Sequence, residues 1–139
     1  MLKNAEALLK EMESQQIPCG GVQEAEGRTI VNCNVSGKHG NYNVIFIFNN
    51  EHDVEIAAMR LAVCPPEKRE KLLPIINDFN ALQRWGKLVI MPDGLVNMRV
   101  DAVITEESAG GICIELFLHI TRMVDDIHPK INTVIWSES

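Results

Sequence analysis

The sequence of 139 residues is poor in aromatic residues and in positive charge. Phe, Trp and Tyr together make up 5% of the chain, so any hydrophobic core must be mostly aliphatic. The 13 Lys and Arg residues are outnumbered by 19 Asp and Glu residues, which gives a formal net charge of −6. Because a nucleic-acid-binding surface neutralises phosphates with many cations, this balance argues against a nucleic-acid partner.

Long apolar runs are also absent. A purely apolar run such as 44–48 is far shorter than the roughly 18 residues that a membrane-spanning helix needs. The first residues, MLKNAEALLKEMESQQ, carry charges throughout and lack the apolar centre of a secretory signal. We therefore expect a cytoplasmic protein with no membrane partner.

Cysteine is present but not in a metal-binding or redox pattern. The four cysteines are Cys19, Cys33, Cys64 and Cys113, and no two of them have CxxC spacing. This spacing argues against a zinc ribbon or a thioredoxin-like motif, and a reducing cytoplasm disfavours disulfides. We expect structural thiols, buried at Cys33 and Cys113, with no metal and no cofactor.

What the chain does contain is a clear set of periodic apolar patterns. Its length fits a single domain covering residues 1–139, with 46% apolar residues. Apolar steps of three and four predict helices, and alternation or short apolar runs between turn residues predict strands. The patterns predict helices over 2–16, 66–83 and 110–135, and strands over 22–25, 28–36, 42–48, 54–63, 86–91 and 95–104.

Glycine and proline mark the predicted turns and interruptions. Glu26-Gly27 and Pro92-Asp93-Gly94 are typical of tight turns between strands. Pro74 lies inside the second predicted helix and should kink it or divide it into two pieces, and Pro129 should bend the last helix. The order α-β-β-β-β-α-β-β-α predicts an α+β fold in which helices pack on a single antiparallel sheet.

The sequence shows only incomplete matches to known catalytic groupings. Gly37–Gly40 contains a Gly-Lys pair but lacks the remaining glycine spacing and the Ser/Thr of a phosphate-binding loop. Asp125 and His128 are three apart on the last predicted helix, where a carboxylate could orient an imidazole, and His119 lies six residues before Asp125 on the same helix. A small-ligand or metal-dependent enzyme using these residues stays a minor hypothesis, because an active site brings polar groups from several elements.

The segment PPEKREKLLPIINDFNALQRWGKLVIMPDGLVNMRVDAVI, residues 65–104, resembles the YbjN family. That family's pattern has a helix with Asn-x-x-Asn, a strand led by glycine, a turn with Asp-Gly and a second strand. The matching residues here are Asn77, Asn80, Gly86, Lys87, Asp93 and Gly94. The last helix, with Asp125-Asp126 followed by Pro129, is similar to the family's ending, although an aromatic residue more often stands where this chain has His128.

The resemblance implies a fold and a type of function. The fold is similar to that of type III secretion chaperones, which are small, acidic, cytoplasmic homodimers with helices packed on a twisted antiparallel sheet. Members are grouped with regulators of sensory transduction, and the family brings no catalytic residues. The resemblance thus implies a non-enzymatic protein-binding or chaperone-like module that acts as a homodimer and binds an unidentified protein.

The fourth predicted strand suggests where such a module binds. Its apolar residues fall on both faces, so one face could cover the core while the other meets a partner. We take as interface residues Val54, Ile56, Ala58 and Met59. An alternative is a structural subunit of a larger assembly, in which a partner strand extends an exposed edge of the sheet.

Overall fold

The computed structural model describes residues 1–138 and has the predicted order of elements. The helices are α1 (Lys3–Ser14), α2 (Arg69–Leu82) and α3 (Glu106–Ile135), with a short 3-10 turn, η1 (Pro66–Lys68), before α2. The strands are β1 (Gly21–Ala25), β2 (Arg28–Gly37), β3 (Gly40–Phe48), β4 (Asp53–Val63), β5 (Lys87–Ile90) and β6 (Leu95–Val103). The α+β fold expected from the sequence is confirmed.

The six strands form one antiparallel sheet in the order β1-β2-β3-β4-β6-β5. The predicted turn at Glu26-Gly27 joins β1 to β2, with φ of 52° and 80° at its two residues. Two successive positive φ values are typical of a type I′ turn, whose twist matches that of the strands. Because β6 lies between β4 and β5, the short strand β5 forms an edge of the sheet.

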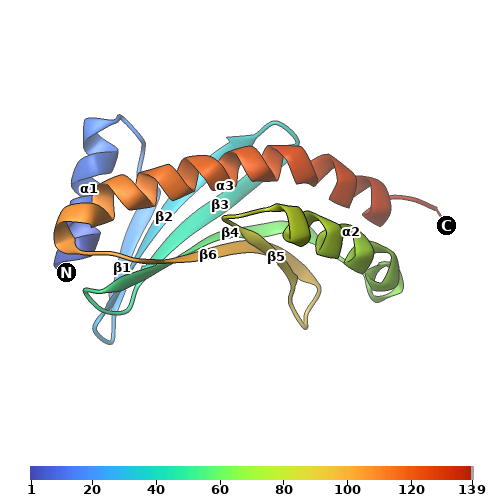
Figure 1. The fold of residues 1–139 in the computed structure, drawn as a ribbon, viewed down its shortest axis with the longest axis horizontal. Coiled ribbons are helices and arrows are strands. Elements are labelled where there is room, and N and C mark those ends of the chain that lie inside the picture. Colours follow the sequence, from blue (N-terminus) through green and yellow to red (C-terminus); the bar gives the residue numbers. More distant parts are fainter. Residues whose placement is uncertain (139) are drawn as a thin grey trace.

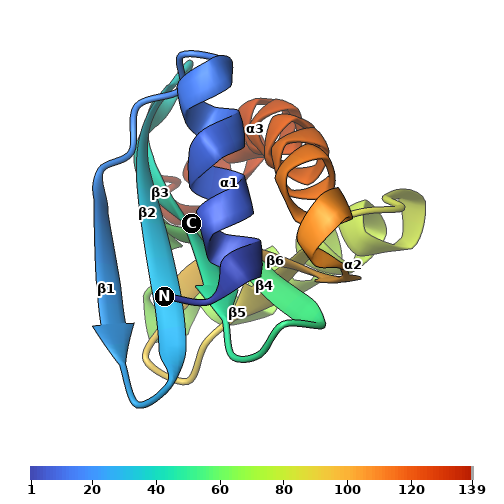
Figure 2. The same cartoon turned by 90° about the vertical axis from the view of Figure 1, so that its left-hand side faces the viewer.

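All three helices cover the same face of the sheet, and the other face carries none of the described helices (Figures 1 and 2). Helix α3 has 30 residues and runs along the whole sheet, about 45 Å at 1.5 Å per residue. It crosses α1 at Gly110, where a Cβ atom would lie 3.0 Å from the Ala7 carbonyl oxygen. No helix within residues 1–138 has the length and apolar character to cross a membrane.

The helix-covered face holds the core, which is largely aliphatic as expected. Phe46 and Phe48 of β3 are fully buried there, and the ring centroids of Phe46 and of Phe117 on α3 are 6.0 Å apart. The strands contribute alternate residues to this face, because successive side chains point to opposite sides of a sheet. The thiols of Cys33 and Cys113 are buried in this core.

Two helices differ in detail from the prediction: α2 in its course through Pro74, and α3 in its first residue. Helix α2 continues through Pro74, so the expectation of two pieces joined there is wrong; the change from 3-10 to α geometry comes at Arg69. Helix α3 begins at Glu106, one turn before the predicted Gly110. The Ser108 N–H donates a hydrogen bond to Thr105 Oγ1, and the Thr105 N–H donates one to Ser108 Oγ, so the two residues form a capping box. That cap offsets the cost of two glycines, about 1 kcal/mol each relative to alanine.

A bulge interrupts β4 where it passes beneath α3. The register between β4 and β6 shifts between Ala58 and Ala62, and Arg60 in this segment has a φ of 59°. The Arg60 N–H donates to Asn97 Oδ1 of β6 at 2.9 Å, and His128 Nε2 of α3 lies 2.6 Å from the Leu61 carbonyl oxygen. These side chains satisfy backbone groups that the irregular ladder leaves unpaired.

Candidate functional site

The predicted interface residues divide between the two faces of β4. Val54, Ile56 and Ala58 are fully buried in the core formed by the chain's own helices, so in this fold they offer no surface to a partner. Met59 is half-buried on the opposite face, next to Asn43 of β3 in register. The sequence pattern identified a strand that is apolar on both faces, but it could not tell which face the helices cover.

The uncovered face of the sheet has an apolar centre. We define the open face by the side chains of β2, β3 and β4 that point away from the helices at its middle: Ile30, Ile45, Ile47, Ala57 and Met59. Ile30 and Ile47 are paired across strands, as are Ile45 and Ala57. Polar and charged side chains border this centre on the same face: Asn32, Asn34, Asn43, Glu55, Arg99 and Asp101.

The helical candidates for catalysis do not converge on one site. Asp125 Oδ1 accepts a hydrogen bond from the Lys38 N–H, in the turn between β2 and β3. His128 is 4% exposed and reaches the bulge of β4 at Leu61. His119 stacks on Trp85, with ring centroids 5.1 Å apart. Each therefore fixes a different structural contact, and residues 1–138 bring together no group of three His, Cys, Asp or Glu that could hold a metal ion.

Burial keeps two thiols and one phenol of the core in their neutral forms. Burial raises the pKa of the Cys113 thiol to about 12 and that of Cys33 to about 11. Burial, together with the nearby Asp125 carboxylate, raises the pKa of Tyr42 to about 12. Because a thiolate and not a thiol is the nucleophile, these two cysteines act as small apolar side chains.

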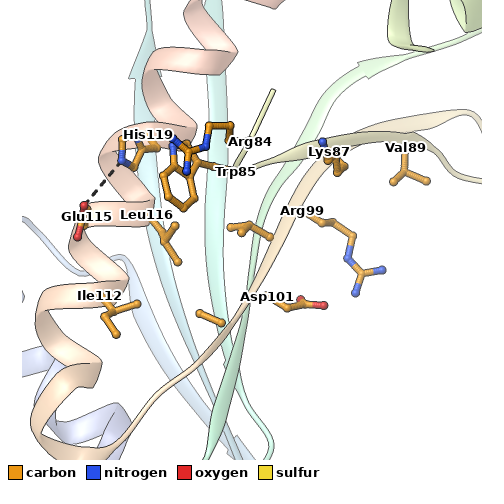
Figure 3. Close-up of a pocket in the computed structure, with 12 residues that line it drawn as sticks. Arg84, Trp85, Lys87, Val89, Arg99, Asp101, Ile112, Glu115, Leu116 and His119 are labelled. Carbon is orange, nitrogen blue, oxygen red and sulfur yellow. Dashed lines mark ion pairs between the residues drawn. The ribbon is translucent and has the colours of Figure 1, made fainter. Parts of the chain in front are cut away.

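A cleft with a volume of about 810 Å³ lies between β6 and the first half of α3 (Figure 3). Its apolar lining comes from Val100 and Ala102 of β6 and from Ile112 and Leu116 of α3. Trp85 closes one end, and the remaining lining residues are Arg84, Lys87, Val89, Arg99, Asp101, Glu115 and His119. The volume is within the usual range for binding pockets, roughly 300–1,000 Å³.

One end of the cleft is built by stacked side chains. The Trp85 ring lies nearly parallel to His119, at an interplanar angle of 21°, and the Arg84 guanidinium lies 5.2 Å from the Trp85 ring centroid. His119 Nε2 is 3.9 Å from Glu115 Oε1 on the preceding turn of α3. Sequence reasoning missed this group, because the α2–β5 loop and α3, which supply it, are distant in the chain.

Gly86 packs closely against β6 and α3 just before the chain enters the sheet at β5. A Cβ atom on Gly86 would lie 2.9 Å from the Met98 side chain and 3.3 Å from that of Met123, so a larger residue would require these side chains to shift. On the other side, the Asn80 side chain bonds both the N–H and the carbonyl of Leu88, as a neighbouring strand would. These two hydrogen bonds fix β5 against the end of α2.

A sequence model of a family described as "Putative bacterial sensory transduction regulator" matches residues 4–125. The chain belongs to this family, YbjN. No curated protein matches the chain. Among solved structures, "Crystal structure of YbjN, a putative transcription regulator from E. coli" is similar over 91% of this chain and 92% of that one. The TM-score is 0.56 at 13% sequence identity. This likeness shows that the two chains share a fold, and it shows nothing about a shared role.

Proposed function

We propose that this YbjN-family chain is a non-enzymatic protein-binding module that works in the cytoplasm as a homodimer joined through the open face of the sheet. The observation that carries the proposal is the uncovered apolar centre of that face, defined above by its three isoleucines with Ala57 and Met59. The family's description as a regulator supports a binding role over catalysis.

The open face has the composition of an interface. Sheets normally bury an apolar face against another layer, and here the helices occupy only the opposite face. An apolar centre bordered by polar residues is the usual arrangement of a protein–protein contact. The face therefore supports a second layer that the chain itself does not supply.

A second copy of the chain is the occupant that the charges favour. A twofold interface brings the same surface from both subunits together, so it needs groups that complement themselves. Arg99 and Glu55 lie side by side on this face, with Arg99 Nη2 3.5 Å from Glu55 Oε2, and Asp101 is two residues further along β6. In a twofold pairing, the Arg99 of one copy can reach the carboxylates of the other.

The polar residues that first suggested catalysis support the non-enzymatic assignment. Asp125 and His128 already hold the β2–β3 turn and the β4 bulge, respectively, in place against α3. These structural contacts account for the presence of both residues on a helix of the core.

Sedimentation velocity on the full chain at tens of micromolar tests the dimer. We expect the wild-type chain to sediment as a dimer and Ile45→Glu to sediment as a folded monomer, since the substitution places a charge in the apolar centre. The matched control is Leu118→Glu, the same kind of change at a residue of α3 that is 47% exposed. A monomeric wild type, or an Ile45→Glu variant that stays dimeric, would contradict the proposal.

A further inference from the structure

The second half of β6 lacks a strand on one side. Strand β5 begins only at Lys87, which pairs with Arg99, whereas β6 continues to Val103. Beyond Arg99, β6 is therefore paired with β4 alone among the strands of residues 1–138. Val103 is 85% exposed at this edge.

The direction of the backbone groups at this edge follows from the register. The Ile104 N–H donates to the His52 carbonyl, on the β4 side. Along an antiparallel strand, the N–H and C=O of successive residues alternate between the two sides. Asp101 and Val103 consequently direct their N–H and C=O groups away from β4, into the space that β5 would fill if it were longer.

The cleft adjoins this edge and continues the path of β5. Its apolar lining, from Val100, Ala102, Ile112 and Leu116, lies on the helix-covered side of β6. A strand paired with Asp101 and Val103 would send alternate side chains into this cleft. An aliphatic side chain is the natural occupant, since the lining there is aliphatic.

The rim of the cleft adds a charge preference. The Arg84 guanidinium stacks on Trp85, and no carboxylate within residues 1–138 forms an ion pair with it. Lys87 differs, because its Nζ already donates to the Asn80 and Gln83 carbonyls at the end of α2. An acidic side chain on the incoming strand would complement Arg84.

The size of the site favours a peptide over a folded subunit. The open edge spans only residues 100–103. That is too short for the contact of a stable dimer, which buries about 800 Å² on each partner. A flexible segment needs only a few backbone hydrogen bonds and one or two filled pockets. The cleft of about 810 Å³ supplies such a pocket.

We propose that a short extended segment of a partner protein, with alternating aliphatic residues and an acidic residue, adds as a strand to β6 at Asp101 and Val103. Its aliphatic side chains fill the cleft, and its acidic side chain pairs with Arg84. This inference rests on the proposed protein-binding function and names the site and the type of partner. It concerns the backbone edge of β6, whereas the proposed homodimer contact uses the side chains of the open face.

The test uses a phage-displayed library of random linear peptides, selected on the full wild-type chain. We expect enriched peptides to alternate aliphatic and polar residues and to contain Asp or Glu. The enriched peptides are then synthesised and titrated by calorimetry. Val103→Pro removes an N–H that faces the open edge, and we expect it to weaken binding by about tenfold or more. Val103→Ala keeps that N–H, and binding should stay within about twofold of wild type.

A charge exchange provides a second test that does not depend on proline at the edge. Arg84→Glu should weaken the acidic peptides and should favour the same peptides with Lys in place of the acid. Equal binding to wild type and Val103→Pro, with no effect of the charge exchange, would overturn the proposal. So would loss of the dimer in Val103→Pro but not in Ile45→Glu, because a second copy would then occupy the edge.

The same samples separate the two proposals. Peptide binding that persists in monomeric Ile45→Glu supports the edge site whatever the oligomeric state. A stable dimer from which no alternating peptide is enriched keeps the proposed function and overturns the edge site.

Discussion

A substitution of His128 distinguishes a structural role of this side chain on α3 from a role in binding a metal or a substrate. The imidazole is 4% exposed, and its Nε2 lies 2.6 Å from the Leu61 carbonyl oxygen at the bulge of β4. If this contact is structural, His128→Ala destabilises the fold in the absence of any ligand. If His128 serves a metal or a substrate, its removal affects binding and leaves stability nearly unchanged.

The expected loss for His128→Ala follows from the contacts that disappear. Leaving the Leu61 carbonyl unpaired in a buried position costs about 1–3 kcal/mol. Deleting a buried ring leaves a cavity, which raises the total to about 3–5 kcal/mol by analogy with aromatic-to-alanine changes in cores. For a chain of this size, the melting temperature should fall by roughly 10–15 °C.

His128→Gln is the matched variant, because its side-chain amide can donate to the same carbonyl. We expect it to recover about 1–2 kcal/mol of the loss. Urea and thermal unfolding followed by circular dichroism measure both variants, with and without added Zn²⁺. The structural reading fails if His128→Ala unfolds within about 1 kcal/mol of wild type, or if Zn²⁺ stabilises wild type and not the variant.

Three further changes test other contacts. Glu51 accepts hydrogen bonds from the first two N–H groups of α1, which lowers its pKa, so Glu51→Gln should cost about 0.5–1 kcal/mol at neutral pH. The stability that this lowered pKa contributes is present above the usual carboxyl pKa and is lost as the pH falls through the folded value. The difference from wild type in unfolding free energy should therefore shrink in acid. Gly111→Ala should stabilise the helix by about 1 kcal/mol in urea unfolding, whereas Gly110→Ala should not, since its Cβ would meet α1 at 3.0 Å. Asn80→Ala should cost about 2 kcal/mol by the same assay, because it leaves both backbone groups of Leu88 unpaired.

The order of the elements could be predicted from local patterns because those patterns act over a few residues. The turn at Glu26-Gly27 and the alternation along β6 specify hairpins without knowledge of the rest of the fold. The sequence pattern places the start of α3 at Gly110, four residues after the observed start at Glu106, because Gly110 and Gly111 indicate a turn before the helix. Only the structure shows Thr105 and Ser108 bonded to each other as a cap.

The surfaces could not be predicted because each depends on elements that are distant in the chain. The apolar residues of β4 are the same whichever face the helices cover, so Val54 and Met59 looked equivalent. Gly86 packs against Met98 just before β5, Trp85 closes one end of the cleft and α3 forms a wall of it. Of these residues, only Gly86 stood out in the sequence, as part of the YbjN resemblance.

The open face of the sheet and the free edge of β6 meet at Asp101. Its side chain points to the open face, while its backbone groups point to the free edge. A strand added at that edge would place its own outward side chains beside the open face and enlarge the area that a second copy covers. Peptide binding and dimerisation should then strengthen each other by the same factor, because such coupling is reciprocal. Sedimentation with and without a selected peptide measures it: the dimer dissociation constant should fall when peptide is bound, and an unchanged constant would show that the added strand lies outside the dimer contact.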